Sequence, residues 1–477
     1  MKKNSLLTFF LGIIIGLSVG AIVFLPHNPF FKNPMFDKIK NLIISVNKNY
    51  IKPVSVDTLI DQFAAFLMQE LDPYSYYLSK DEYREYKNDI YGYYYGFGFS
   101  YFKLKNQIYI GKVFKNSPAD KKGLSFGYKI LKINNISPDS IPLKRLKNYL
   151  KGKKHIKLRI SNCKNDTIQC SLTADTIYLS NILYTIYADT VAYIKINSFT
   201  SGISQKFRDY LSNIKSKKIN NLVIDLRNNS GGLIKEAYSI LDAFFPKGIL
   251  LFTIEKNNSQ KNKFIATDYY TGKGLKLIVL VNKNTASAAE LFAGVIQDYD
   301  RGIIIGSKTF GKAVVQNDIL LENGGVLHIT TKRVILPSGR WIQKNSDLYD
   351  REKDTIITYK TLHNRPVFSN TGIIPDITKS SAEISYLIYF LNDNRDTLAY
   401  YIDTLCSLYA QNPQLMVDYL YKLNSDYNII RYWLLSFGIS DADIYLLPYD
   451  DIFKSSLLYF SENKYRKILN LDKKTSI

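Results

Sequence analysis

Hydrophobic and polar residues follow one another along the chain in patterns that predict both strands and helices. An almost unbroken apolar run from Leu275 to Val281 predicts a buried strand, and apolar residues at helical spacing from Leu291 to Ile296 follow it after a polar turn. A second apolar run, Gly302 to Gly306, predicts another strand. This order indicates a right-handed βαβ unit in an α/β fold, so the turn before the helix should lie at the carboxyl edge of a parallel sheet, where active sites collect.

Further elements extend this unit on both sides. Residues 191–196 and 221–226 predict strands, with a helix over about 205–214 between them. Downstream, residues 314–321 and 326–334 alternate around Glu322-Asn323-Gly324-Gly325, which is a strong hairpin signal.

Helical spacing dominates the two flanking regions. The segment from Phe36 to Leu71 shows it in two pieces separated by Pro53, so we expect two helices. From Ser380 onward it returns, over 384–391 and 419–435, without a recognisable catalytic constellation. This tail is either a helical cap or an interaction surface, and we favour the cap.

The N-terminus carries a long apolar segment. Met1-Lys2-Lys3 precedes Leu6 to Leu25, 20 residues without a charge, which can cross a bilayer at about 1.5 Å per residue. The lysines favour a cytoplasmic N-terminus and export of the remainder. A cleaved signal usually has a shorter apolar region, and the only cleavage candidates, around Val19-Gly20-Ala21, lie inside the run. We predict an uncleaved anchor over residues 1–27, with a cleaved signal as the alternative.

Composition adds one unusual feature. The 477 residues allow about two to four domains. A formal net charge of +21 and a pI near 9.4 would suit an anionic partner such as nucleic acid or a lipid surface. The lysines are spread along the chain without a long basic run, so we favour a general compositional bias over nucleic-acid binding. A nearby anionic membrane is compatible with this charge.

Three residues in the central stretch could act together chemically: Ser287, Lys312 and Gln316. A serine hydroxyl needs a base to become a nucleophile, and none of the four histidines has a sequence setting typical of a triad. Lysine can be that base if burial lowers its pKa to about 7–8, at a cost of about 4 kcal/mol. The first N–H groups of the helix after Ser287 can stabilise an oxyanion, and the Gln316 amide could orient the amine. Taken singly, the serine would more simply be a helix N-cap and the lysine a surface residue.

Three motifs surround these residues: Thr285-Ala286-Ser287-Ala288-Ala289-Glu290, Gln297-Asp298-Tyr299-Asp300-Arg301 and Thr309-Phe310-Gly311-Lys312-Ala313-Val314-Val315-Gln316. They resemble the motifs of the carboxyl-terminal processing, or tail-specific, serine peptidases. The resemblance implies that Ser287 is the nucleophile, Lys312 the general base and Gln316 the residue that orients it. Thr285 and Ala289 replace serines, and Ala313 replaces a glycine, but no catalytic group is lost. We expect a structural role for Asp298, with support of the site as the alternative.

A second motif after the strand at 221–226 concerns the oxyanion. Asp225-Leu226-Arg227-Asn228-Asn229-Ser230-Gly231-Gly232-Leu233 resembles the Asp-Leu-Arg-Asn-Asn-Pro-Gly-Gly-Leu of the same family. The resemblance implies that an N–H of Gly231 or Gly232 joins the N–H of Ala288 in an oxyanion hole. Sequence does not decide between the two glycines, and a tight strand-to-helix turn is the simpler interpretation.

Residues 92–175 resemble a PDZ domain. Gly96-Phe97-Gly98-Phe99 matches the loop whose backbone N–H groups bind a terminal carboxylate, and the following strand could accept a peptide as an added strand. Turns at Ser117-Pro118-Ala119, Gly123 and Gly127 and a helix near Leu143–Leu150 follow in the expected order. Tyr128 replaces a usual aspartate.

The three cysteines show no metal-ligand spacing, and we expect neither metal nor cofactor. Cys163 and Cys170 flank a turn and could form a disulfide in an oxidising compartment, or both could remain thiols. Cys406 would then be unpaired.

The resemblance implies a ClpP/crotonase-like α/β peptidase core, residues 190–380, with an inserted PDZ domain. The helical spacing predicts a helical segment over 36–90 and a helical extension over 381–477. Family similarity covers about 36–380. The expected function is a membrane-anchored serine endopeptidase in the periplasm that cleaves exported polypeptides near accessible C-termini. The PDZ domain would bind the tail or gate access. A homo-oligomer is compatible with the sequence, and an inactive PDZ-bearing adaptor is the alternative function.

Overall fold

The computed structural model describes residues 34–104, 106–138, 141–162, 166–256, 260–322, 324–344, 355–379, 402–423, 430, 434 and 450–471. The chain divides into two compact units, Met1–Lys80 with Asp318–Ile329, and Asp81–Asn317 with Thr330–Ile477. The predicted anchor over residues 1–27 lies outside the described residues. In the described part of the chain, no helix is both long and apolar enough to span a bilayer.

The described residues of the smaller unit include helices α2 (Pro34–Asn49) and α3 (Val56–Gln69), strand β1 (Tyr76–Leu78) and parts of strands β16 (Val314–Leu320) and β17 (Val326–Ile335). Helices α2 and α3 are separated around Pro53, which confirms the predicted break. The Ser55 hydroxyl accepts a hydrogen bond from the Thr58 N–H and caps α3. Strand β1 pairs antiparallel with the first residues of β17.

The expected PDZ domain begins after helix α4 (Lys80–Tyr91). Its five-stranded antiparallel sheet has the order β3-β4-β5-β6-β7, while β2 pairs with β8. The elements are β2 (Tyr93–Gly96), β3 (Phe99–Leu104), β4 (Gln107–Val113), α5 (Pro118–Lys121), β5 (Lys129–Ile133), α6 (Leu143–Leu150), β6 (His155–Ser161), β7 (Thr167–Thr173) and β8 (Asp175–Tyr178). Alternate residues of β6, Ile156, Leu158 and Ile160, are buried in the core, where Leu146 of α6 also packs.

A six-stranded sheet forms the centre of the peptidase domain. Its order is β20-β15-β14-β11-β10-β9, and every neighbouring pair is parallel except β9 with β10. The strands are β9 (Ile182–Tyr187), β10 (Val191–Ile196), β11 (Asn221–Asp225), β14 (Lys276–Val281), β15 (Ile303–Gly306) and β20 (Ile377–Thr378). The predicted βαβ unit is confirmed, because β14 and β15 are parallel and helix α9 (Ala288–Asp298) connects them.

Both faces of this sheet are buried, which explains the continuous apolar runs of its strands. On one face, Leu277, Val279 and Val281 of β14 share a core with helices α7, α8 and α9 and strand β12. The covering elements are α7 (Ile203–Ser216), α8 (Ile234–Leu241), the 3₁₀ turn η3 (Asp242–Phe244), β12 (Leu250–Lys256) and β13 (Gln260–Ile265). Two hairpins, β16 (Val314–Leu320) with β17 and β18 (Thr358–Lys360) with β19 (Pro366–Phe368), complete the domain.

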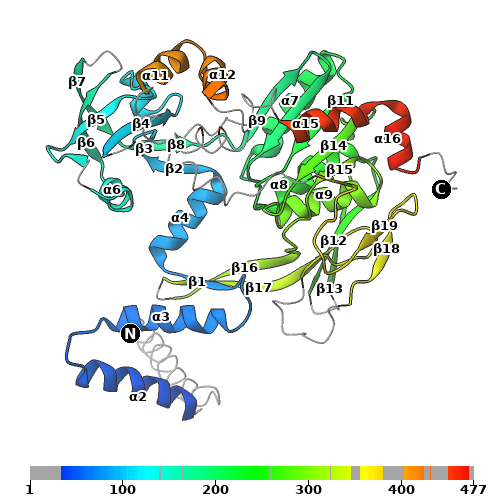
Figure 1. Ribbon diagram of the computed structural model, residues 1–477. Helices are drawn as coiled ribbons and strands as arrows, with labels where there is room; N and C mark the ends of the chain where they lie inside the picture. The colour runs from blue at the N-terminus through cyan, green and yellow to red at the C-terminus, as the bar shows by residue number, and fades with distance from the viewer. Residues whose placement is uncertain are drawn as a thin grey trace, which may run out of the picture. The chain divides into compact units, whose positions relative to one another are not determined.

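The end of the chain covers the other face. Helices α15 (Asp451–Leu457) and α16 (Glu462–Ile468), joined by η6 (Leu458–Phe460), pack on Ile278 and Leu280 of β14 (Figure 1). Phe453 meets the rings of Tyr187 and Tyr193 edge-on at 5.2 and 5.4 Å. Residues 450–471 are therefore a layer of the peptidase core. These helices lie within the predicted helical extension over 381–477, and the division at 380 stays a prediction.

Helices α11 (Ile402–Gln411) and α12 (Pro413–Leu423) form an earlier part of the extension. Tyr409 of α11 contacts the ring of Phe126 at 5.0 Å. The predicted helical periodicity over 384–391 lies outside the described residues, as does most of 424–435.

The cysteines differ from expectation. Cys406 is disulfide-bonded and Cys170 is a free thiol. The Cys163–Cys170 bond considered from the sequence is therefore not formed, and the prediction that Cys406 is unpaired was wrong. Cys163 lies outside the described residues. Sequence spacing left a bond between the nearer pair and two free thiols equally open, because it cannot show that Cys406 is buried against Phe126, 280 residues away.

If residues 450–471 are part of the peptidase core, truncating Phe453 should destabilise the protein. We expect Phe453→Ala to lower the free energy of unfolding by about 3–5 kcal/mol, because it leaves a cavity against two tyrosine rings. Urea unfolding followed by tyrosine fluorescence would measure the change. Leu458→Ala is the matched control, because Leu458 is 62% exposed, and it should shift stability by less than about 0.5 kcal/mol. Equal stabilities for the two variants would contradict this assignment.

Candidate active site

Ser287 lies at a sharp turn between β14 and α9. It has φ 55° and ψ −120°, a conformation that L residues rarely adopt, and it immediately precedes the first residue of the helix, Ala288. Such backbone strain is stored at functional sites, and an outlier of this kind is typical of a serine nucleophile on a strand-to-helix turn. The predicted position of Ser287 at the carboxyl edge of the sheet is confirmed.

The buried carboxylate of Glu290 joins the serine turn to the lysine loop. One oxygen, Oε2, accepts hydrogen bonds from the Ser287 N–H at 3.0 Å and the Lys312 N–H at 2.8 Å. The other, Oε1, accepts from the Gly311 N–H at 2.7 Å and the Thr309 hydroxyl at 2.5 Å. Burial raises the pKa of Glu290 to about 6, and the four hydrogen bonds oppose this rise. At neutral pH Glu290 is therefore largely ionised and holds both loops.

Ser287 and Lys312 line one pocket. The pocket is open to solvent, and a volume of about 320 Å³ includes solvent at its mouth. The other lining residues are apolar: Ile234, Ala288, Leu291, Ala313, Val314, Val334, Leu336 and Ile342. None of the histidines that the structure describes lines this pocket. His328 instead pairs with Asp318, and His363 with Asp300. The serine and the lysine thus face a common apolar space, as the sequence hypothesis requires.

Gln316, on β16, lies beyond the residues that line the pocket. Its amide group donates a hydrogen bond to the Thr330 hydroxyl on β17 at 3.0 Å. This bond fixes Gln316 within the β16–β17 hairpin. The expectation that Gln316 orients Lys312 stays a prediction.

The double-glycine loop lies directly against the serine. Gly231 and Gly232 have φ values of 109° and 128°, and a Cβ atom on Gly231 would approach within 2.8 Å of Ser287 Cβ and 3.1 Å of Ala288 N. The Gly231 N–H already donates to Asn229 Oδ1 at 2.8 Å, and the buried Asn229 amide in turn donates to the Ile196 carbonyl. Of the two glycines, Gly232 is therefore the better candidate for an oxyanion donor.

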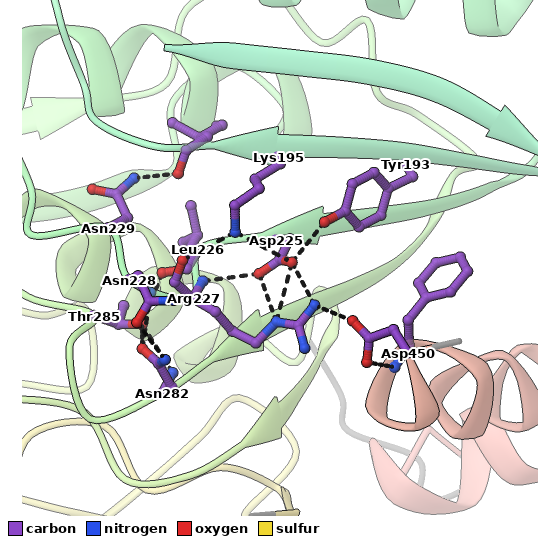
Figure 2. Close-up of polar contacts among 12 residues, drawn as sticks. Tyr193, Lys195, Asp225, Leu226, Arg227, Asn228, Asn229, Asn282, Thr285 and Asp450 are labelled. Atoms are coloured by element: carbon purple, nitrogen blue, oxygen red, sulfur yellow. Dashed lines mark hydrogen bonds and ion pairs between the residues drawn. The ribbon is translucent and has the colours of Figure 1, made fainter. Parts of the chain in front are cut away.

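Several hydrogen bonds tie this loop to the serine turn (Figure 2). The Ala286 N–H donates to the Asn229 carbonyl at 2.9 Å, and the Thr285 hydroxyl donates to the Leu226 carbonyl at 2.8 Å. The Asn282 amide donates to Asn228 Oδ1, and Asn282 Oδ1 accepts from the Asn228 N–H, both at 2.9 Å. The residues that precede the nucleophile and the candidate oxyanion loop therefore form one rigid structure.

Asp298 supports the end of α9. It is buried and pairs with the equally buried Arg340 at 2.7 Å, and it accepts a hydrogen bond from the Ser338 N–H. Burial raises the pKa of Asp298, and Arg340 opposes that rise. Asp298 is not among the residues that line the pocket, which agrees with the structural role expected for it.

In the PDZ domain, the side chains of Phe97 and Phe99 are buried in the core. Gly98 has φ 83°, and its carbonyl accepts hydrogen bonds from the Phe114 N–H and the Ser117 hydroxyl. A peptide could therefore reach the Gly96–Phe99 loop only through its backbone, as in the predicted carboxylate-binding mode. Among the described residues, no group of three or more His, Cys, Asp or Glu side chains is placed to hold a metal ion.

Comparison with known proteins agrees with these observations. Residues 190–350 match the model of peptidase family S41, and residues 92–161 match the PDZ domain model. The protein is thus a serine protease with a PDZ domain. More specifically, its peptidase region is similar to family S41, and the chain resembles CtpA-like serine proteases.

Curated relatives carry the same description. The chain is 29% identical over 343 residues to a probable CtpA-like serine protease of Staphylococcus epidermidis strain ATCC 12228, covering 71% of this chain and 67% of the relative. It is 26% identical over 392 residues to a probable CtpA-like serine protease of Staphylococcus haemolyticus, covering 79% of each. Among solved structures, the photosystem II D1 C-terminal processing protease matches with a TM-score of 0.41 and 20% identity, covering 71% of this chain and 86% of that one.

Glu290 lies within one of the motifs found in the sequence, but the sequence alone did not assign it a role. A carboxylate three residues after a helix-starting serine is the usual sign of a capping box, which explains the bond to Ser287 but not those to the lysine loop.

We expect Glu290→Gln to disturb both catalytic loops. The substitution replaces one acceptor oxygen by an NH₂ group, which leaves two of the four donors without an acceptor. The cost should be about 1–3 kcal/mol of stability for each buried donor left unpaired. Because the serine and lysine loops would shift, kcat should fall by about 10- to 100-fold. Peptide hydrolysis and urea unfolding would measure these effects.

Glu236→Gln is the matched control. Glu236 is also buried and accepts from two backbone N–H groups, those of Gly202 and Ser204. This variant should lose stability but keep the kcat of the folded enzyme. A Glu290→Gln enzyme with wild-type kcat would refute the linking role.

Proposed function

We propose that this protein is a Ser–Lys endopeptidase that cleaves exported polypeptides near accessible C-termini. The observation that carries the proposal is that Ser287, in its strained turn, and Lys312 line one apolar pocket while Glu290 holds the backbone of both. An apolar pocket disfavours a charged ammonium group and therefore favours the neutral amine that a general base requires.

The proposed reaction proceeds through an acyl-enzyme. Ser287 Oγ attacks the scissile carbonyl carbon, and its proton passes to the Lys312 amine. The N–H groups of Ala288 and Gly232 stabilise the oxyanion. When the tetrahedral intermediate collapses, the leaving amine takes the proton from Lys312. Water, deprotonated by Lys312, then hydrolyses the ester, and the proton returns to Ser287. Gln316 would keep the lysine directed at the serine.

We infer the cellular setting from the sequence. The uncharged segment from Leu6 to Leu25, preceded by two lysines, supports anchoring in the inner membrane with the catalytic domain in the periplasm. The PDZ domain would bind the substrate tail through the Gly96–Phe99 loop, or gate access to the catalytic site. Sequencing of the mature N-terminus tests the anchor, and a start near residue 26 would exclude it.

The direct test removes each catalytic group. Ser287→Ala and Lys312→Ala should each abolish nearly all cleavage of an unfolded polypeptide with a free C-terminus, while circular dichroism stays unchanged, because the hydroxyl and its base act as one unit. Lys308→Ala is the control. Lys308 lies four residues before Lys312 and is exposed, so its replacement should leave the rate of cleavage unchanged. Undiminished cleavage by either catalytic variant would exclude this dyad.

The pocket also predicts which bonds are cut. Its apolar lining favours a small or medium apolar residue directly before the scissile bond, such as alanine, valine or leucine. An aspartate at that position could pair only with Lys312, and this pairing would hold the proposed base in its charged form, so we expect kcat/KM to fall at least about 100-fold. A peptide series varied at this position, with the same substitutions placed several residues upstream as controls, would measure the preference. Equal cleavage of the aspartate and leucine peptides would show that this pocket does not bind that side chain.

A further inference from the structure

The C-terminal segment reaches the active-site region through one buried ion pair. Asp450 Oδ2 accepts a hydrogen bond from Arg227 NH2 at 2.6 Å, although the two residues are 223 positions apart. Their side chains are only 3% and 11% exposed. Solvent and salt screen such a pair little, so its electrostatic attraction is far stronger than that of a surface ion pair.

Arg227 is held by two carboxylates at once (Figure 2). Its Nε and NH2 groups donate to the fully buried Asp225, at 3.0 and 2.7 Å, and the same NH2 donates to Asp450. Burial alone would raise the pKa of Asp225, but Arg227 and Lys195 hold it well below its usual range. Asp225 is thus a fixed anion on one side of the guanidinium, and Asp450 is the anion on the other.

The backbone of Arg227 begins the double-glycine loop. Its carbonyl accepts a hydrogen bond from Lys195 Nζ at 3.1 Å. The next two residues, Asn228 and Asn229, bond to Asn282 and to the Ala286 N–H, which directly precedes Ser287. The loop ends at Gly231, which lies against Ser287 and Ala288, and at the next residue, Gly232, which lies against the Phe199 backbone. A short chain of contacts therefore leads from Asp450 to the candidate oxyanion donor.

We propose that Asp450 is a positioning residue for the peptidase reaction. Through its contact with Arg227 it fixes the loop from Arg227 to Gly232. It thereby sets the position of the Gly232 N–H relative to Ser287. The C-terminal segment, which lies outside the region 190–350 that matches family S41, then controls catalysis as well as covering the sheet. This inference rests on the proposed oxyanion role of the loop.

A purely structural role of Asp450 would lead to a different result. Asp450 Oδ1 also accepts from the Phe453 N–H and caps α15. If capping were its only function, its replacement would change stability without changing the kcat of the folded enzyme. Asp450→Asn separates the two roles, because asparagine is an equally good N-cap but cannot provide the negative charge for Arg227.

The experiment compares full-length Asp450→Asn with wild type by steady-state peptide cleavage and by the rate of labelling with a fluorophosphonate, which needs the serine and the oxyanion donors. We expect kcat and the labelling rate to fall about 10- to 100-fold with little change in KM, because a small displacement of an oxyanion donor has effects of this size. Asp451→Asn is the matched control. Asp451 is the next residue, and its side chain is 92% exposed. Removing its charge should leave kcat and the labelling rate unchanged.

A double-mutant cycle identifies the path. Arg227→Lys should lower kcat on its own, and adding Asp450→Asn should then cost little more, because the two act through the same contact. Additive losses would show that Asp450 does not act through Arg227. Wild-type kcat in Asp450→Asn, with Ser287→Ala inactive, would overturn this inference and leave the proposed function intact. Full activity in Ser287→Ala would instead remove the proposed function itself.

Discussion

The geometry of the site depends first on one buried anion. Glu290 accepts four hydrogen bonds, from Ser287 on one side and from Thr309, Gly311 and Lys312 on the other. These segments are about twenty residues apart, and each carries one half of the proposed dyad. A neutral side chain could not accept all four bonds, so the carboxylate is the group that fixes the two halves relative to each other.

The surroundings of Ser287 explain why its strained backbone conformation persists. A positive φ at a non-glycine residue costs about 1–3 kcal/mol and persists only where the surroundings over-determine it. Here the Ser287 N–H is fixed by Glu290, the preceding Ala286 N–H by Asn229, and the following helix is fully buried. Gly231 leaves the space that Ser287 Cβ occupies. The serine therefore cannot relax without breaking bonds on both sides.

Much of this fold could be predicted from the sequence, because buried strands and long amphipathic helices give strong periodic signals. The run at 275–281, the helix after Ser287 and the strand at 303–306 are cases of this kind. The role of Glu290 could not be predicted, since a motif letter does not show which loop a side chain bonds. The helices of residues 451–468 are short, and only tertiary contacts through Phe453 and Tyr465 reveal that they cover the sheet.

The two ends of the catalytic domain depend on each other. Burying both faces of a parallel sheet requires a layer on each, and here the second layer comes from the last described residues of the chain. That layer is attached at Asp450 to the loop where β11 ends, and β11 lies beside β14, whose end carries Ser287. Since parallel strands end at one edge, this contact lies close to the loops that carry the site. It is the contact through which we propose that the tail acts on the site.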